Sequence, residues 1–370
     1  MGGMEPARFS WRNVVVATLL LGIPVLGFFA WQSWSMSQAE KVDYARWFTG
    51  YIKRSGPLNH LDARFKDENS DLVADAPADP GQLLDPAELV FAPIASSSRD
   101  TEDTWREFLA HLSKVTGKKV KFTSFEEHRP QIAGLLDGTL HVTGFGTGLV
   151  PVAVNSAGFV PQVALAKADG TFNYQMEIVV PADSPIQKIE NLKDSEWRRK
   201  NLTKHPDETN PKWKLTVTGS GSHSGFKAPL IFLKDEYGLH PGNDYDFVFS
   251  GGHAQSLKAI ANKHAQAAAV ASDLLEEGLA DPEIGLKEGQ YRVIYQSKPF
   301  PKAAFGVPNR LKPELAAKVR EAFLSFDFKG TKLEAMLRGS HTEKFTPIDY
   351  KKDWAPVRAI DEAMLKWASP

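Results

Sequence analysis

The segment Val217–Phe226, VTGSGSHSGF, combines three serines, three glycines and a histidine between an apolar run and an amphipathic stretch. Hydroxyls and free backbone N–H groups at the start of a helix are the donors that an oxyanion binds, and glycines let the backbone come close. The segment lacks the Gly-Lys-Ser/Thr ending of a P-loop, which disfavours a nucleotide. A plain N-cap is the alternative, and it accounts for one serine rather than three.

Further polar residues follow other predicted strands in the same way: His253 in FSGGH (249–253), Ser272–Asp273, Phe145–Thr147, and Ser96 with Ser97. A lone histidine at a helix start is more often a surface cap, and the last two serines could equally cap the following helix. Open α/β sheets bind ligands beyond the carboxyl ends of their strands. The sequence therefore predicts one crevice that these residues share.

Short apolar runs that alternate with amphipathic segments must position these residues. The runs cover 89–93, 119–124, 140–145, 215–218, 246–250 and 267–272, and predicted helices cover 100–115, 127–138, 226–237 and 253–262. This alternation predicts right-handed βαβ units with parallel strands. We expect two α/β lobes, with the extended segments Tyr174–Val180 and Ala303–Val307 between them as a double hinge. Pro229 predicts that its helix starts late or bends, because proline removes a backbone donor.

The stretch 193–214 is charged and has no periodicity, so we expect a surface insertion there. Its basic residues Arg198, Arg199 and Lys200 are expected to form a solvated face.

Residues Val14–Trp31 form an 18-residue run without charge, preceded by Arg8 and Arg12. That length is just enough to cross a hydrocarbon core of about 30 Å, and the arginines favour a cytoplasmic N-terminus. A cleaved signal peptide is the alternative, although its apolar core is normally shorter and precedes a small-residue cleavage site. We expect an uncleaved anchor within residues 1–35, then a juxtamembrane helix and an acidic, proline-rich, solvated linker over 36–88.

The overall composition narrows the function classes. A net charge of -1 gives no electrostatic reason to expect nucleic acid, and the absence of cysteine excludes disulfides, thiolate metal sites and lipid-modified cysteine. Consecutive Glu126, Glu127 and His128 lack the i, i+4 spacing of helical metal ligands. No serine lies in a G-x-S-x-G elbow. We therefore expect no metal, no cofactor and no catalytic residue.

Across Leu89–Tyr295 the chain resembles the phosphonate-binding proteins of ABC importers, the PhnD type. Three stretches carry the resemblance in order: DGTFNYQMEIVVPADSPI (169–186) to the family's hinge segment, SHSGF (222–226) with Pro229 to its phosphonate cradle, and SGGHAQSLKAIANK (250–263) to its histidine helix. The resemblance implies the bilobed, type II periplasmic-binding fold, and it makes Pro229 a family feature.

The resemblance also implies roles for individual residues. Ser222 and Ser224 would donate to the phosphorus oxygens, His253 would donate a charge-assisted bond, Tyr174 would close from the hinge, and Asp273 would occupy the family's acidic ligand position.

Three departures from the family bear on the ligand. His223 replaces a threonine, Phe145 replaces the tyrosine of aminoethylphosphonate binders, and Ala303 or a neighbour replaces a second acidic group. A buried ammonium needs full pairing, so a single carboxylate favours phosphate, phosphite or a small apolar-tailed phosphonate. If protonated His223 donates to the anion, affinity should fall as pH rises.

These observations predict an extracytoplasmic, non-enzymatic receptor with lobe 1 over 89–175 and 303–370 and lobe 2 over 176–302. Its predicted partners are a small phosphorus oxyanion, an ABC permease and, through the N-terminal helix, the membrane. Two alternatives stay open: a membrane-anchored sensory or scavenging subunit of the same fold, and a hydrolase that uses His223 or His253 as a base.

Overall fold

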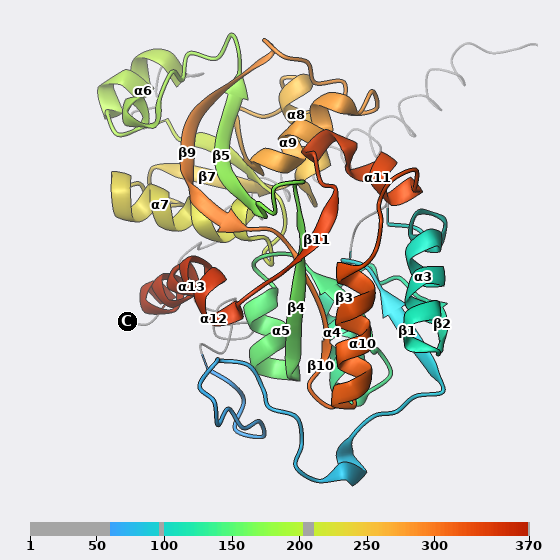
Figure 1. Cartoon of the computed structure of the whole chain (residues 1–370). Helices are drawn as coiled ribbons and strands as arrows, with labels where there is room; N and C mark the ends of the chain where they lie inside the picture. The colour runs from blue at the N-terminus through green and yellow to red at the C-terminus, as the bar shows by residue number, and fades with distance from the viewer. Residues whose placement is uncertain (1–59, 96–99, 203–210, 369–370) are drawn as a thin grey trace, which may run out of the picture. The chain divides into compact units, whose positions relative to one another are not determined.

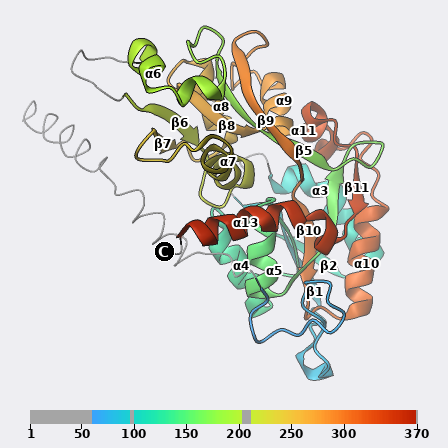
Figure 2. The same cartoon turned by 90° about the vertical axis from the view of Figure 1, so that its left-hand side faces the viewer.

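The computed structural model describes residues 60–95, 100–202 and 211–368 (Figures 1 and 2). Contacts divide the chain into residues 1–48 and 49–370. The predicted anchor (1–35), the predicted juxtamembrane helix, Ser96 and Ser97 all lie outside the described residues. Within those residues, no helix combines the length and the apolar character needed to cross a membrane. The anchor therefore stays a prediction.

The first sheet has six strands in the order β11-β4-β10-β3-β1-β2. They are β1 (Glu88–Ala92), β2 (Lys119–Phe122), β3 (Val142–Phe145), β4 (Phe159–Ala166), β10 (Ala304–Pro308) and β11 (Lys344–Pro347). Strand β1 pairs in parallel with β2 and β3, whereas β10 joins β3 to β4 in antiparallel pairing. The helices of this part are α3 (Glu102–Thr116), α4 (His128–Asp137), α5 (Val150–Ala157), α10 (Pro313–Leu324) and α11 (Lys332–Leu337).

The second sheet has five strands in the order β7-β6-β8-β5-β9, in the upper part of Figure 1. They are β5 (Asn173–Pro181), β6 (Trp213–Val217), β7 (Tyr245–Phe249), β8 (Ala267–Ala271) and β9 (Tyr291–Pro301). Strand β6 pairs in parallel with β7 and β8, and β5 runs antiparallel to β8 and β9. Its helices are α6 (Ser195–Leu202), a π-helix (His223–Lys227), α7 (Ala228–Tyr237), α8 (His253–Ala261) and α9 (Ser272–Ala280). The chain ends in α12 (Tyr350–Asp353) and α13 (Ala355–Ala368).

The two predicted hinge segments are strands. Tyr174–Val180 lies in β5, whose Ile178, Val179 and Val180 are at most 1% exposed, and Ala303–Val307 largely forms β10. Both segments are therefore extended, as predicted, and each begins where the chain enters its sheet. The chain crosses between the sheets at residues 167–172 and 302–303, and these crossings lie side by side because the Lys302 N–H donates to the Phe172 carbonyl (2.7 Å).

The described part of the acidic segment, residues 60–87, differs from the predicted solvated linker. Backbone bonds join it to the body: the Asp62 N–H donates to the Asn155 carbonyl (2.9 Å), and the Leu84 N–H donates to the Arg310 carbonyl (2.7 Å). Val73 is buried. The segment lies against the body because its backbone donors find partners there.

The prediction that the basic residues of the 193–214 insertion form a solvated face is wrong for Arg198. This side chain is buried, lies 3.7 Å from the Asp244 carboxylate and donates to the Leu192 carbonyl, whereas Arg199 and Lys200 are exposed. A charged side chain is buried in this way when it is paired and hydrogen-bonded.

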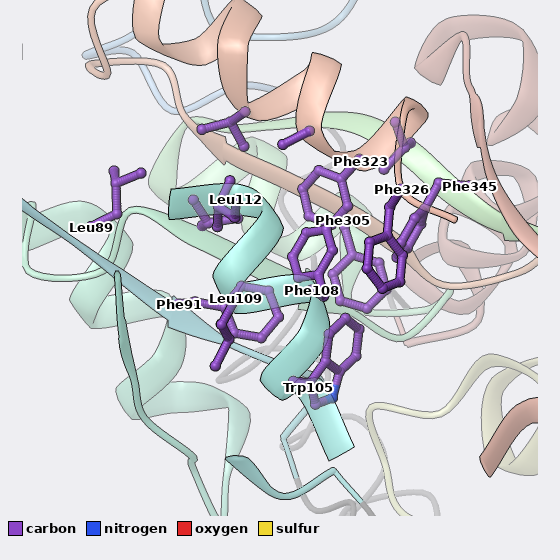
Figure 3. Packing of buried hydrophobic residues seen from close by; sticks show 14 of the residues in the cluster. Leu89, Phe91, Trp105, Phe108, Leu109, Leu112, Phe305, Phe323, Phe326 and Phe345 are labelled. Atoms are coloured by element: carbon purple, nitrogen blue, oxygen red, sulfur yellow. The ribbon is translucent and has the colours of Figure 1, made fainter. Parts of the chain in front are cut away.

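An aromatic core holds the first sheet's early and late segments together (Figure 3). Phe108 of α3 stacks on Phe323 of α10 with ring centroids 4.7 Å apart, and Trp105 lies 5.0 Å from Phe91 of β1 and 5.4 Å from Phe305 of β10. Trp105 and Phe108 share the helical face that the sequence predicts to be apolar. Burying such rings dominates core energetics, so residues from about 300 onward fold together with those near 100.

Candidate functional site

The candidate site begins with residues 218–225, here called the serine loop, which follow β6 and include the first three residues of the π-helix. Ser222 caps the π-helix because its Oγ accepts the Gly225 N–H (3.0 Å). A Cβ at Gly225 would lie 2.1 Å from Thr218 Oγ1, so only glycine fits there. Pro229 falls in the first turn of α7, where its missing N–H costs little.

His253 is the first residue of α8 and reaches the serine loop. Its Nδ1 accepts the Ala271 N–H (3.3 Å), and its Nε2 lies 3.4 Å from Ser222 Oγ. In the neutral ring the proton must then sit on Nε2, which faces the loop. Burial lowers the pKa of His253 to about 4. At neutral pH His253 is therefore an uncharged N–H donor, and a bond from it to an oxyanion would be charge-assisted by the charge of the acceptor.

His223 is buried at the centre of the serine loop, with 2% of its surface exposed. Its ring meets the Phe300 ring edge-on at 4.3 Å, and neither ring nitrogen has a hydrogen-bond partner among the described residues. Burial first, and then the Lys227 charge, hold the pKa of His223 well below 6.5. Burial therefore disfavours the protonated ring on which the predicted pH dependence was conditional.

Tyr174, the second residue of β5, joins the serine loop to the first sheet. Its hydroxyl hydrogen-bonds with the side chains of Ser224 and Thr147, and burial raises its pKa well above the ordinary value. Thr147 follows β3 and donates to the Pro301 carbonyl (2.8 Å). Groups from both sheets therefore meet at this hydroxyl.

Asp273 lies at the start of α9, with Lys302 Nζ 3.5 Å from its Oδ2. Burial raises the pKa of Asp273, and the Lys302 cation counteracts that shift. Lys302 is missing from the residues predicted from sequence. The available signal was a lysine inside the otherwise apolar stretch FPKAAF.

Phe145, the last residue of β3, is in the core. Its ring packs edge-on against Phe159 of β4, with centroids 5.0 Å apart. Its backbone leads directly into the loop 146–149, so Phe145 supports that loop by packing.

A second buried ion pair ties the serine loop to the C-terminal helix. Lys227 Nζ donates to Asp361 Oδ1 of α13 (2.8 Å) and to the Gly148 carbonyl (2.7 Å). A Cβ at Gly148 would lie 2.7 Å from the Gly221 carbonyl oxygen and 2.9 Å from the His223 nitrogen. The loop 146–149 of the first sheet is therefore in direct backbone contact with the serine loop. The Lys227–Asp361 pair was not predicted, because a lysine and an aspartate this far apart in sequence give no local signal.

The neutral state of His223 leads to a pH prediction. Between pH 6 and pH 8, wild type and His223→Gln should show parallel changes in affinity for methylphosphonate, because the ligand titrates in both and the ring in neither. Calorimetric titrations at both pH values measure this. A steeper loss in wild type, by more than about threefold, would show that the ring takes up a proton in the complex.

The serines lead to a second prediction. Ser222→Ala should lower the free energy of unfolding by about 0.5–2 kcal/mol, because it removes the cap of the π-helix. Each of Ser222→Ala and Ser224→Ala should also weaken oxyanion binding by roughly tenfold to a hundredfold, the value of one bond to a charged acceptor. Unchanged affinity in both variants would exclude the serine loop as the binding site.

Comparisons with known proteins identify the family of this chain. A family model described as "ABC transporter, phosphonate, periplasmic substrate-binding protein" matches residues 90–354. The phosphate-import protein PhnD of Mycolicibacterium smegmatis is 27% identical over 237 residues, which are 62% of this chain and 68% of that protein.

Solved structures show the same fold. The binding protein component of an ABC phosphonate transporter from Pseudomonas aeruginosa superposes with a TM-score of 0.57 at 20% identity, covering 76% of this chain and 97% of that one. PhnD1 from Prochlorococcus marinus, solved in complex with methylphosphonate, superposes with a TM-score of 0.59 at 18% identity. The match covers 76% of this chain and 100% of that one.

Proposed function

Because this chain belongs to the family of phosphonate-binding periplasmic proteins of ABC transporters, we propose that it captures a small phosphorus oxyanion at the serine loop and passes it to a membrane permease. The family acts in substrate binding for transport, on the extracytoplasmic side. The proposal assigns no chemical step to the site.

One observation carries the proposed location of the ligand. Around the serine loop, both nitrogens of buried His223 and the buried Thr218 Oγ1 lack hydrogen-bond partners among the described residues. A buried polar group without a partner costs about 1–3 kcal/mol, so such groups call for an explanation. An oxyanion beside them would accept from the Thr218 hydroxyl and from whichever His223 nitrogen carries the proton.

Capture would involve movement between two lobes, predicted over 89–175 with 303–370 and over 176–302; because β5 begins at Asn173, the first boundary falls slightly earlier, after the crossing at 167–172. The proposed hinges are the two adjacent crossings at 167–172 and 302–303, a double hinge as in a type II binding protein. The backbone contact of Gly148 with Gly221 and His223 would then form on closure around the ligand.

The ligand we propose is phosphate, phosphite or a small apolar-tailed phosphonate. Two similarities support it: one relative is named a phosphate-import protein, and one structure holds methylphosphonate. The site supports it too, because Asp273 already has a cationic partner in Lys302 and Phe145 offers no hydroxyl.

Selectivity tests this proposal. Phosphate, phosphite or methylphosphonate should bind at least about tenfold more tightly than 2-aminoethylphosphonate, a difference of roughly 1.4 kcal/mol. Competition titrations on the full chain in detergent measure the ratio. Tighter binding of the aminophosphonate would contradict the proposed ligand class, and absence of binding by every phosphorus oxyanion would contradict the function itself.

A further inference from the structure

Lys302 is a buried lysine at the return crossing between the two sheets. It is 5% exposed, and its backbone N–H is fixed on the Phe172 carbonyl (2.7 Å). Its Nζ donates to Thr342 Oγ1 (3.1 Å) and lies 3.5 Å from Asp273 Oδ2. Two partners from separate elements therefore hold the ammonium group in one place.

The carboxylate that Lys302 pairs with adjoins the candidate site. Ser272, the residue before Asp273, accepts the N–H of Gln175, the residue after Tyr174 (3.0 Å), and the Ala271 N–H donates to His253 Nδ1 (3.3 Å). Glu277, four residues further along α9, adds negative charge near Asp273. Lys302 thus supplies positive charge at the point where the site is otherwise acidic.

We propose that Lys302 is a specificity-determining residue, an inference that rests on the proposed function. Its ammonium group neutralises the Asp273 carboxylate, and this restricts the ligand to oxyanions without an amine. A ligand ammonium beside Asp273 would have to displace the Lys302 ammonium or be buried next to it. Either leaves a buried cation incompletely paired, which is strongly unfavourable. The lysine therefore acts as a repulsive element against amines, the usual means by which a site rejects a close analogue.

The test compares two ligands that differ by one amine, 2-aminoethylphosphonate and ethylphosphonate. The measured quantity is the ratio of their dissociation constants for the full chain in detergent. Lys302→Met removes the cation and frees Asp273. The dissociation constant of 2-aminoethylphosphonate, divided by that of ethylphosphonate, should therefore fall at least tenfold, which means a shift in favour of the aminophosphonate. The affinity for ethylphosphonate should weaken in this variant, because the unpaired Asp273 carboxylate repels the anion, and the ratio of the two dissociation constants corrects for that loss.

Matched variants separate charge from packing. Lys302→Gln keeps a donor for Thr342 without the charge, and it should shift the ratio in the same direction as Lys302→Met. Lys302→Met with Asp273→Asn removes both charges and should return the ratio to within about threefold of wild type. Asp273→Asn alone leaves the lysine unpaired. It should raise the same ratio at least threefold, because the aminophosphonate then binds more weakly relative to ethylphosphonate.

An unchanged ratio in the Lys302 variants, with ethylphosphonate still bound, would overturn the inference and leave the proposed function intact. An unchanged ratio in Asp273→Asn would overturn it as well. If wild type binds neither phosphonate, nor phosphate or phosphite, the proposed function fails, and the inference fails with it.

Discussion

Lys227→Met is expected to lower the free energy of unfolding by about 3–5 kcal/mol, the usual cost of removing one partner from a buried ion pair. The Lys227 and Asp361 side chains are 6% and 4% exposed, so water cannot replace the lost cation. The same lysine also satisfies the Gly148 carbonyl. Urea denaturation followed by circular dichroism measures the loss.

Two controls sharpen this prediction. Lys263→Met breaks an exposed pair with Asp183, whose partners are 66% and 64% exposed, and should change stability by at most about 1 kcal/mol. The double variant Lys227→Met with Asp361→Leu removes both charges and should recover part of the loss. A loss below about 1 kcal/mol in Lys227→Met would show that the pair is not coupled to folding.

The loss in the free energy of unfolding caused by Lys227→Met, here called the deficit, should also depend on pH. Burial raises the pKa of Asp361, and Lys227 opposes that rise. Without the lysine, the folded carboxyl takes up a proton at higher pH than the unfolded one. Stability of the variant therefore increases relative to wild type as pH falls, and the deficit should be smaller at pH 5 than at pH 7.

Gly148→Ala is expected to weaken ligand binding by roughly tenfold to a hundredfold, the result of overpacking worth about 1–3 kcal/mol. The new Cβ would lie 2.7 Å from the Gly221 carbonyl oxygen and 2.9 Å from the His223 nitrogen, both backbone atoms that cannot rotate away. If these loops meet on closure, the clash raises the energy of the closed form alone.

The matched control is Gly146→Ala, two residues earlier, because a Cβ there meets nothing within 4 Å. Its affinity should remain within about threefold of wild type. Titration calorimetry with methylphosphonate and thermal unfolding of both variants give the comparison. Equal affinity in the two variants would show that the loop 146–149 does not approach the serine loop in the bound protein.

Local sequence patterns were sufficient to predict the parallel part of the fold. The runs 89–93, 215–218 and 267–272 form β1, β6 and β8, and the apolar face of α3 is buried as expected. The turn chemistry of the serine loop was also readable, because its glycines and the Ser222 cap act within a few residues. Such signals depend on backbone geometry and on contacts along one element.

The antiparallel strands were predicted only in part. Strands β4, β9 and β11 were given no assignment, and β5 and β10 were predicted as extended hinge segments. Strand β9 follows no clear alternation: most of its residues are partly or fully exposed, and its pairing with β5 shifts register. Its position comes from its neighbour in the sheet, and that pairing is set by tertiary structure.

The sequence by itself determined where donors gather along the chain, and through family resemblance it pointed to an anion at the serine loop. Only the tertiary structure decided the charge state of the site. Burial keeps His223 and His253 neutral, and Lys302 and Lys227 find Asp273 and Asp361 across the fold. The physical reason is that pKa values and buried ion pairs depend on desolvation and on partners distant in sequence, which no local pattern encodes.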